Sequence, residues 1–170
     1  MTKKIVYKFE PFITVYKENF KNKYQSRKNF HKIKLQDAVM VLLENEKGQI
    51  LFLNEYRRGI NKKTIGLPGG HVEVSEKPIH TIKRELLEET GYLAKEWKLL
   101  FKYTRNGTYH CGNDFIFIAK LSKKSSHKKK HENLPKKWID RKKMLSMLKN
   151  NKFETAGMMA TVAFFLLFKK

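Results

Sequence analysis

The sequence predicts an α/β protein in which helices pack on a mixed β-sheet. Strand-like and helix-like segments are intermixed along the chain, which is typical of such a sheet. The 170 residues contain no internal repeat and no linker rich in glycine, serine or proline, so we expect one domain over residues 1–170. A hydrophobic content of 41% is enough to form a buried core in a chain of this length.

The first part of the chain is expected to be an extension of the core. Residues 12–18 and 28–35 alternate weakly between apolar and polar side chains, which predicts the two strands of a β-hairpin joined by a basic connection. We therefore assign residues 1–36 to an N-terminal strand extension and residues 37–170 to the core.

Clearer strands open the core. Residues 38–43 and 50–53 are strongly apolar and flank a turn that ends at Gly48, as expected for two neighbouring strands. Residues 66–70 have the sequence Gly-Leu-Pro-Gly-Gly, which predicts a loop.

A helix is predicted over residues 75–90. Ser75 is a suitable N-cap, Glu76 suits the first turn, and Pro78 is tolerated there. Gly91 is placed where a helix commonly ends in the left-handed conformation.

The rest of the chain is predicted to add two strands and two helices. Residues 97–103 and 114–120 alternate as strands do. Asp140 is a candidate cap for a short helix over residues 141–149, and a final apolar helix is expected over residues 155–168.

Neither secretion nor membrane insertion is expected. Cys111 is the only cysteine, so the chain cannot form an internal disulfide, and a reducing cytoplasm is the simplest location. No run near Met1 is apolar enough for a signal peptide. The apolar stretch at 156–168, at about 1.5 Å per residue, is far shorter than the roughly 30 Å hydrocarbon core.

The charge is strongly positive, with 37 Lys and Arg against 16 Asp and Glu and a formal net charge of +21. Such a field attracts polyanions, but lysine far outnumbers arginine, the residue favoured for bidentate recognition of bases and phosphates. A lysine-rich soluble surface explains the composition equally well. Nucleic acid is therefore not the expected partner, although the charge leaves it open.

Three glutamates are predicted to cluster on one face of the helix at 75–90. At 3.6 residues per turn, Glu85 and Glu89 lie almost above each other and Glu88 flanks them. Their mutual repulsion would become an attraction around a divalent cation such as Mg²⁺ or Mn²⁺, which prefers oxygen ligands. An ordinary solvated acidic helix is the alternative.

The spacing around these glutamates decides between the two interpretations. Gly70 is followed at fixed intervals by Glu76, by the segment at 84–86, by Glu88 and Glu89, and by Gly91. This pattern resembles the complete signature of the Nudix hydrolases. The resemblance implies an α/β/α sandwich around a mixed sheet and a metal-dependent hydrolase of nucleoside diphosphate compounds.

The resemblance also implies roles for individual residues. Glu85 and Glu89 would ligate the metal, with Glu88 as a further ligand or a catalytic base, and the carbonyl group of Gly69 would complete the metal site. Gly70 would lie close to the substrate.

Within the same signature, Arg84 and Glu76 would pair and hold the loop against the helix beside the catalytic glutamates. Gly91 would end the helix.

Beyond the signature, the chain most resembles the ADP-ribose and ADP-sugar pyrophosphatases. The segment at 54–58, Asn-Glu-Tyr-Arg-Arg, is similar to a substrate-binding segment of that branch, which places Arg57 and Arg58 near the substrate. The N-terminal strands of that branch commonly exchange between partners, so a homodimer is expected.

The chain departs from that branch in two places. Residues 103–108 lack the usual proline, and residues 122–131 lack the usual acidic side chains. Glu132 is the only acid between Asp114 and Asp140 and is therefore our candidate for a mobile general base. The alternatives are three histidines: His110, His127 and His131.

Two other functions stay open. A nucleoside triphosphate or RNA 5′-end pyrophosphohydrolase would explain the lysine excess and the missing proline. A Nudix domain that only senses nucleotides is less favoured, because a binding site has no need for a repulsive acidic cluster.

Overall fold

The computed structural model describes residues 3–21, 23–24, 26–125 and 134–168 and confirms the α/β class. The described elements, in chain order, are β1 (Lys3–Phe9), β2 (Ile13–Lys21), β3 (Ser26–Leu35), β4 (Ala38–Glu44), β5 (Ile50–Arg57), a 3₁₀ turn (Arg58–Ile60), β6 (Lys62–Gly66), β7 (Gly69–His71), α1 (Pro78–Thr90), β8 (Tyr92–Thr104), β9 (Asn113–Lys124), β10 (Lys136–Ile139), α2 (Arg141–Lys149) and α3 (Ala156–Phe168).

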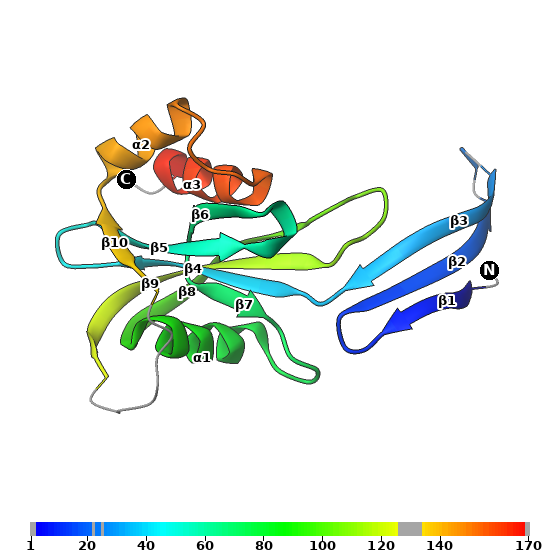
Figure 1. The fold of residues 1–170 in the computed structure, drawn as a ribbon, viewed down its shortest axis with the longest axis horizontal. Coiled ribbons are helices and arrows are strands. Elements are labelled where there is room, and N and C mark those ends of the chain that lie inside the picture. The colour runs from blue at the N-terminus through cyan, green and yellow to red at the C-terminus, as the bar shows by residue number, and fades with distance from the viewer. Residues whose placement is uncertain (1–2, 22, 25, 126–133, 169–170) are drawn as a thin grey trace.

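The core is a mixed sheet between two layers of helix. Its strand order is β10-β5-β4-β9-β8, with β6 paired to β5 and β7 paired to β4. The β4–β9 pair is parallel and the other pairs are antiparallel. Helix α1 lies on one side of this sheet, and α2 and α3 lie on the other (Figure 1). The predicted sandwich around a mixed sheet is confirmed.

Alternation along β4 divides the buried side chains between the two faces. Val39, Val41 and Leu43 pack with Ile82 and Leu86 of α1. The intervening Leu42 belongs to a second cluster on the opposite face. This second cluster contains Leu42, Ile50, Phe52, Leu67, Ile116, Ile118, Ile139, Met144, Phe153, Met158, Val162 and Phe165. Because successive side chains of a strand point to opposite faces, one strand holds both helical layers in place.

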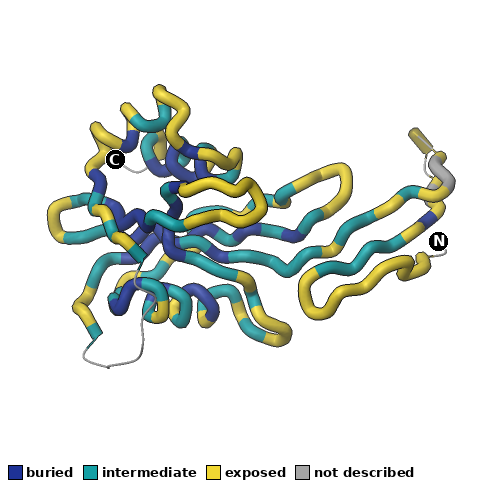
Figure 2. Tube along the Cα trace, viewed as in Figure 1, coloured by how far each residue is buried: buried dark blue, intermediate teal, exposed yellow. Residues whose placement is uncertain are grey.

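The N-terminal extension is a three-stranded antiparallel sheet, so the predicted two-stranded hairpin was incomplete. Strand β2 pairs with both β1 and β3, and the sheet projects away from the core (Figure 1). Every residue of β1 is exposed, and Figure 2 shows this strand in the colour of exposed residues. Because neither face of β1 is buried, its sequence carries no apolar alternation from which a strand could be predicted.

Gln36 and Asp37 join the two sheets. The backbone carbonyl of Asp37 accepts a hydrogen bond from Val72 N (2.8 Å), and its carboxylate accepts from Asn113 N (2.8 Å) and from Asn113 Nδ2 (3.2 Å). The guanidinium group of Arg105 donates to the Gln36 carbonyl. Two parts of the core therefore hold this short connection.

Helix α1 starts later than predicted. Helix α1 begins at Pro78, with an extended Lys77 as N-cap and no side-chain cap, so the prediction of Ser75 as the cap was wrong. A residue before proline is disfavoured in the helical conformation, which places the boundary at Lys77, and Ser75 instead adopts a positive φ of 69°. The helix ends as predicted, at Gly91 with a φ of 73°.

The C-terminal helices follow the predictions closely. Asp140 caps α2 by accepting a hydrogen bond from Lys143 N at 2.7 Å. Phe165 of α3 is buried, whereas Leu167 and Phe168 at its end are 73% and 71% exposed, so burial of this helix is only partial. Among the described residues, no helix combines the length and the apolar character needed to cross a bilayer. Strands β6, β7 and β10 are short and were not predicted.

Candidate functional site

Arg84 gathers the acidic side chains of the predicted signature. Its Nη1 donates to Glu85 Oε1 (3.0 Å) and Glu88 Oε2 (3.1 Å), and its Nη2 donates to Glu76 Oε2 (3.2 Å). Glu73 lies 3.6 Å from Nη2. The expected pairing of Glu76 with Arg84 is present, although Glu76 precedes the helix and does not belong to its first turn.

Protonation states follow from this arrangement. Burial opposes the charged form of Arg84, but Glu76, Glu85 and Glu88 outweigh it and raise the pKa of the guanidinium group. Hydrogen bonds from Arg84 and from the Thr81 hydroxyl lower the pKa of Glu76. Arg84 is therefore a permanent cation among carboxylates, which positions them and reduces their repulsion.

Gly69 and Gly70 let their loop lie against helix α1. At each of the two positions a different neighbour leaves no room for a Cβ atom. A Cβ atom on Gly69 would lie 2.1 Å from the carbonyl oxygen of Val39, because β7 pairs closely with β4 there. A Cβ atom on Gly70 would lie 2.3 Å from Glu85 Oε1. Glu89 Oε2 accepts a hydrogen bond from Gly69 N at 2.9 Å. Any side chain at either position would displace the backbone or the Glu85 carboxylate.

The Glu85 carboxylate borders a cavity of about 630 Å³ between the core and the N-terminal sheet. This volume is typical of a small-molecule site. The lining residues are Pro11, Phe12, Gln36, Gly70, His71, Glu73, Val74 and Glu85. The position of the turn between β1 and β2 beside Glu85 was not predicted, because it depends on how the two sheets are oriented.

Arg105, Asp114 and Tyr103 form a second polar cluster near His71. Arg105 Nε donates to Asp114 Oδ1 at 2.8 Å, and the Tyr103 hydroxyl is hydrogen-bonded to the same carboxylate. Burial and the Asp114 charge raise the pKa of Tyr103. Burial lowers the pKa of His71, as do the positive charges of Arg105 and Arg57, so His71 is neutral at pH 7. These residues were not predicted, because the chain brings them together only across β7, β8 and β9.

The predicted substrate arginines occupy different environments. Arg57 forms an ion pair with Glu55 beside Gly66, and its charge is close enough to influence His71. Arg58 begins the exposed 3₁₀ turn. Arg57 therefore lies on the side of the candidate site, while the structure gives Arg58 no contact with it.

The predicted general base, Glu132, lies outside the described residues, as do His127 and His131. His110 is described and lies exposed at a positive φ of 58°, in the connection between β8 and β9.

The donor set suits a hard cation. Across the described part of the chain, no group of three His, Cys, Asp or Glu side chains is arranged as a ready metal cage. Arg84 and the amide of Gly69 hold the three glutamates instead. A ready cage is not required for Mg²⁺, which keeps several water ligands and needs few carboxylates. Three carboxylates beside a glycine loop with no space for a Cβ atom fit such an ion.

The pattern that defines the NUDIX domain matches residues 34–162. This match covers the core sheet, the glycine loop, α1 and most of α3, and the chain therefore belongs to the Nudix family. The resemblance found in the sequence is confirmed.

Curated relatives match about half of the chain. An ADP-ribose pyrophosphatase of Bacillus subtilis is 37% identical over 76 residues, which are 44% of this chain and 41% of that protein. A methanol dehydrogenase activator of Bacillus methanolicus is 31% identical over 90 residues, 52% of this chain and 49% of that protein. The chain thus spans less than half the length of these relatives.

Solved structures extend the likeness of fold to nearly the whole chain. A structure described as an ADP compounds hydrolase superposes with a TM-score of 0.77 at 20% identity and covers 96% of this chain and 89% of its own. A NUDIX hydrolase from Nitrosomonas europaea gives a TM-score of 0.60 at 21% identity and covers 76% and 87%. At these identities the likeness concerns the fold alone.

Proposed function

We propose that this protein hydrolyses the diphosphate bond of a nucleoside diphosphate derivative, with ADP-ribose or an ADP-sugar as the preferred substrate. The observation that carries the proposal is the cluster of Glu85, Glu88 and Glu89 beside the cavity at Gly70. A diphosphate needs its charge neutralised before water can attack phosphorus, and carboxylates achieve this only through bound cations.

Glu85, Glu88 and Glu89 would hold Mg²⁺, or Mn²⁺, together with the backbone carbonyl of Gly69. When bound, the cation supplies charge neutralisation and an acidified water ligand. Arg84 keeps two of the carboxylates oriented before the ion arrives, because it contacts both from the same guanidinium nitrogen. Gly70 leaves room for the diphosphate to approach Glu85.

In the reaction, the oxygen of water forms a bond to one phosphorus and the bond from that phosphorus to the bridging oxygen breaks. A general base accepts the proton of the attacking water. Glu132 is our candidate for the base and Glu88 is the alternative, since Glu88 is exposed beside the ligands. The products are a nucleoside monophosphate and a sugar phosphate. Arg57 would pair with a phosphate of the substrate.

The names of two relatives support ADP-ribose as the substrate. The relatives from Bacillus subtilis and from Mycobacterium tuberculosis, the latter 34% identical over 64 residues, are both described as ADP-ribose pyrophosphatases. A probable DHNTP pyrophosphohydrolase of Lactococcus lactis, 35% identical over 74 residues, and the net charge of +21 favour a nucleoside triphosphate or an RNA 5′ end as the second candidate.

We also propose a cytoplasmic homodimer, and the N-terminal sheet supports the dimer. Exposed apolar side chains on β1 and the following turn, among them Tyr7, Phe9 and Phe12, offer a surface that a second copy would cover. We also propose that the chain divides into an N-terminal extension at residues 1–36 and a core at residues 37–170.

The decisive experiment compares Glu89→Gln with wild type in a product-resolved screen of nucleoside diphosphate and triphosphate compounds with Mg²⁺. We expect wild type to cleave an ADP-linked compound best and Glu89→Gln to lose at least about a thousandfold in kcat, because electrostatic stabilisation of this kind supplies several kcal/mol. Glu46→Gln, in an exposed turn outside the cavity, serves as the control. Unchanged turnover in Glu89→Gln would refute the assignment of the metal ligands.

A further inference from the structure

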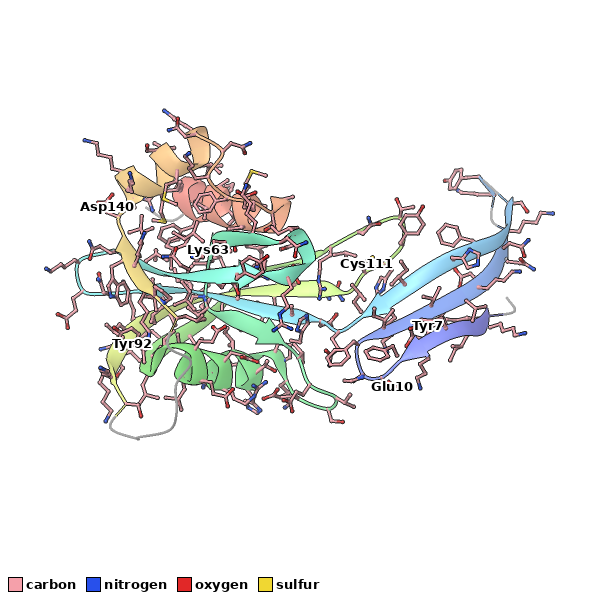
Figure 3. All side chains as sticks on the ribbon, viewed as in Figure 1. Tyr7, Glu10, Lys63, Tyr92, Cys111 and Asp140 are labelled. Carbon is pink, nitrogen blue, oxygen red and sulfur yellow. The ribbon has the colours of Figure 1, made fainter. Side chains whose placement is uncertain are left out.

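A second cavity, of about 760 Å³, lies away from the acidic cluster and is lined by β5, β6, β10, α2 and the segment before α3. It shares no lining residue with the cavity beside Glu85. We call it the lysine cavity because four lysines contribute to its wall. Its lining residues are Asn54, Glu55, Tyr56, Lys63, Thr64, Ile65, Pro135, Lys137, Ile139, Lys143, Met147, Lys152 and Glu154. Lys63, which belongs to β6, is labelled in Figure 3.

The charge inside the lysine cavity is uncompensated. Its two acidic residues are already paired, Glu55 with Arg57 and Glu154 with Lys62 (2.8 Å), and both of these cations lie outside the lining. In contrast, the ion pairs of the described chain include none of the four lining lysines. Four ammonium groups around one concave surface repel one another unless an anion lies between them.

Thr64 adds a polar group within the wall of the lysine cavity. This residue of β6 is only 8% exposed, and its hydroxyl oxygen is buried without a hydrogen-bond partner among the described residues. A buried hydroxyl without a partner costs about 1–3 kcal/mol, and an ordered water is one common partner for such a group. Thr64 contributes to the wall that also carries Lys63.

The remaining wall is apolar and partly aromatic. Ile65, Ile139 and Met147 line it together with Tyr56, whose side chain is 57% exposed. Among common metabolites, a nucleotide combines the two required chemistries, since its phosphates carry the negative charge and its base has flat apolar faces that stack on aromatic rings. The volume is also in the range of small-molecule sites.

We propose that the lysine cavity is a second nucleotide site. The phosphates of a nucleoside diphosphate pair with the lysines, and the base packs against Tyr56 and Met147. The site needs no divalent cation and makes no use of the glutamates of α1, so it is independent of the proposed hydrolysis.

Calorimetric titration with ADP in the presence of EDTA tests the proposal, because chelation removes metal-dependent binding at the acidic cluster. We expect saturable binding that Lys143→Glu weakens at least about tenfold, since a charge-assisted hydrogen bond is lost and a like charge is introduced. Lys142→Glu is the matched control, because it changes the same charge in the same helical turn but lies outside the cavity. Equal weakening by both variants would show a response to net charge only and would overturn the proposal.

Thr64→Val is a control within the wall itself. We expect this variant to melt at the same temperature as wild type or above it, because an unpartnered hydroxyl is removed, and to bind ADP as wild type does, because that hydroxyl is not accessible from the cavity. Glu85→Gln should bind ADP as wild type does, whether or not it hydrolyses any substrate. Loss of binding in Glu85→Gln, the absence of saturable binding in wild type, or pyrophosphate binding as tight as that of ADP would each overturn the assignment to a separate nucleotide site.

Discussion

The core sheet is covered by helices on both faces, whereas the N-terminal sheet leaves many apolar side chains exposed. Phe52 in β5 is completely buried, while Phe9 in β1 is 55% exposed, although both are phenylalanines in antiparallel strands. An isolated sheet of this kind gains little from hydrophobic burial. The comparison indicates that the core is stabilised by its own burial, whereas the extension depends on its joint with the core.

The largest difference should come from truncating these two phenylalanines. Phe52→Ala is expected to lower the free energy of unfolding by about 3–5 kcal/mol, whereas Phe9→Ala should change it by less than about 0.5 kcal/mol. Urea unfolding at low protein concentration measures both values. A Phe9→Ala effect that grows with protein concentration would show that a second copy covers β1.

A smaller loss is expected from Gly69→Ala at the edge of the core sheet. The new methyl group would meet the carbonyl oxygen of Val39, and overpacking of this kind costs about 1–3 kcal/mol. Gly59→Ala is the control, because a Cβ atom there has no neighbour within 4 Å. Thermal unfolding of the two variants should differ clearly, and similar melting temperatures would mean that β7 can move away from β4.

Gly70→Ala should affect activity more than stability. Its methyl group would meet the end of the Glu85 side chain, which can rotate away at little cost to the fold. Displacing a metal ligand by about 1 Å is expected to lower kcat by about a hundredfold. Steady-state kinetics beside a melting curve would measure both quantities, and full activity would argue against Glu85 as a ligand.

The smallest effect is expected for the loss of stability when Glu76 is protonated at low pH. Because the folded-state pKa of Glu76 is lowered, its contribution to stability is present above the unfolded-state pKa and is lost as the pH falls through the folded-state value. Glu76→Gln should therefore reduce the pH dependence of unfolding in the acidic range. Melting curves from pH 7 down to pH 3 would show this, and identical curves for variant and wild type would contradict it.

Local patterns in the sequence predicted the signature, the core strands and the cap at Asp140, because each depends on neighbours within a few residues. The start of α1 was mispredicted because Ser75 satisfies the usual preference for an N-cap, while the restriction that Pro78 imposes on Lys77 decided the boundary. Strand β1 was missed because exposure on both sides removes the alternation that reveals a strand.

Contacts between residues far apart in the sequence limited how much of the site could be predicted. The glutamates could be placed on one helical face from their spacing alone. The cavity beside Glu85, in contrast, is closed by Phe12 and Gln36, whose positions depend on the orientation of two sheets. The unpartnered hydroxyl of Thr64 is equally invisible in the sequence, since it arises from packing around β6.

The short connection at Gln36 and Asp37 is held tightly against the core. Four hydrogen bonds fix these two residues, so the N-terminal sheet cannot swing freely as a flexible arm would. Gln36 also lines the cavity beside Glu85, and Phe12 lines it from the turn between β1 and β2, at the same core-facing end of the sheet. A molecule that binds β1 and tilts the N-terminal sheet is therefore expected to widen or narrow the space in front of Glu85, because Gln36 and Phe12 both belong to the wall of this cavity.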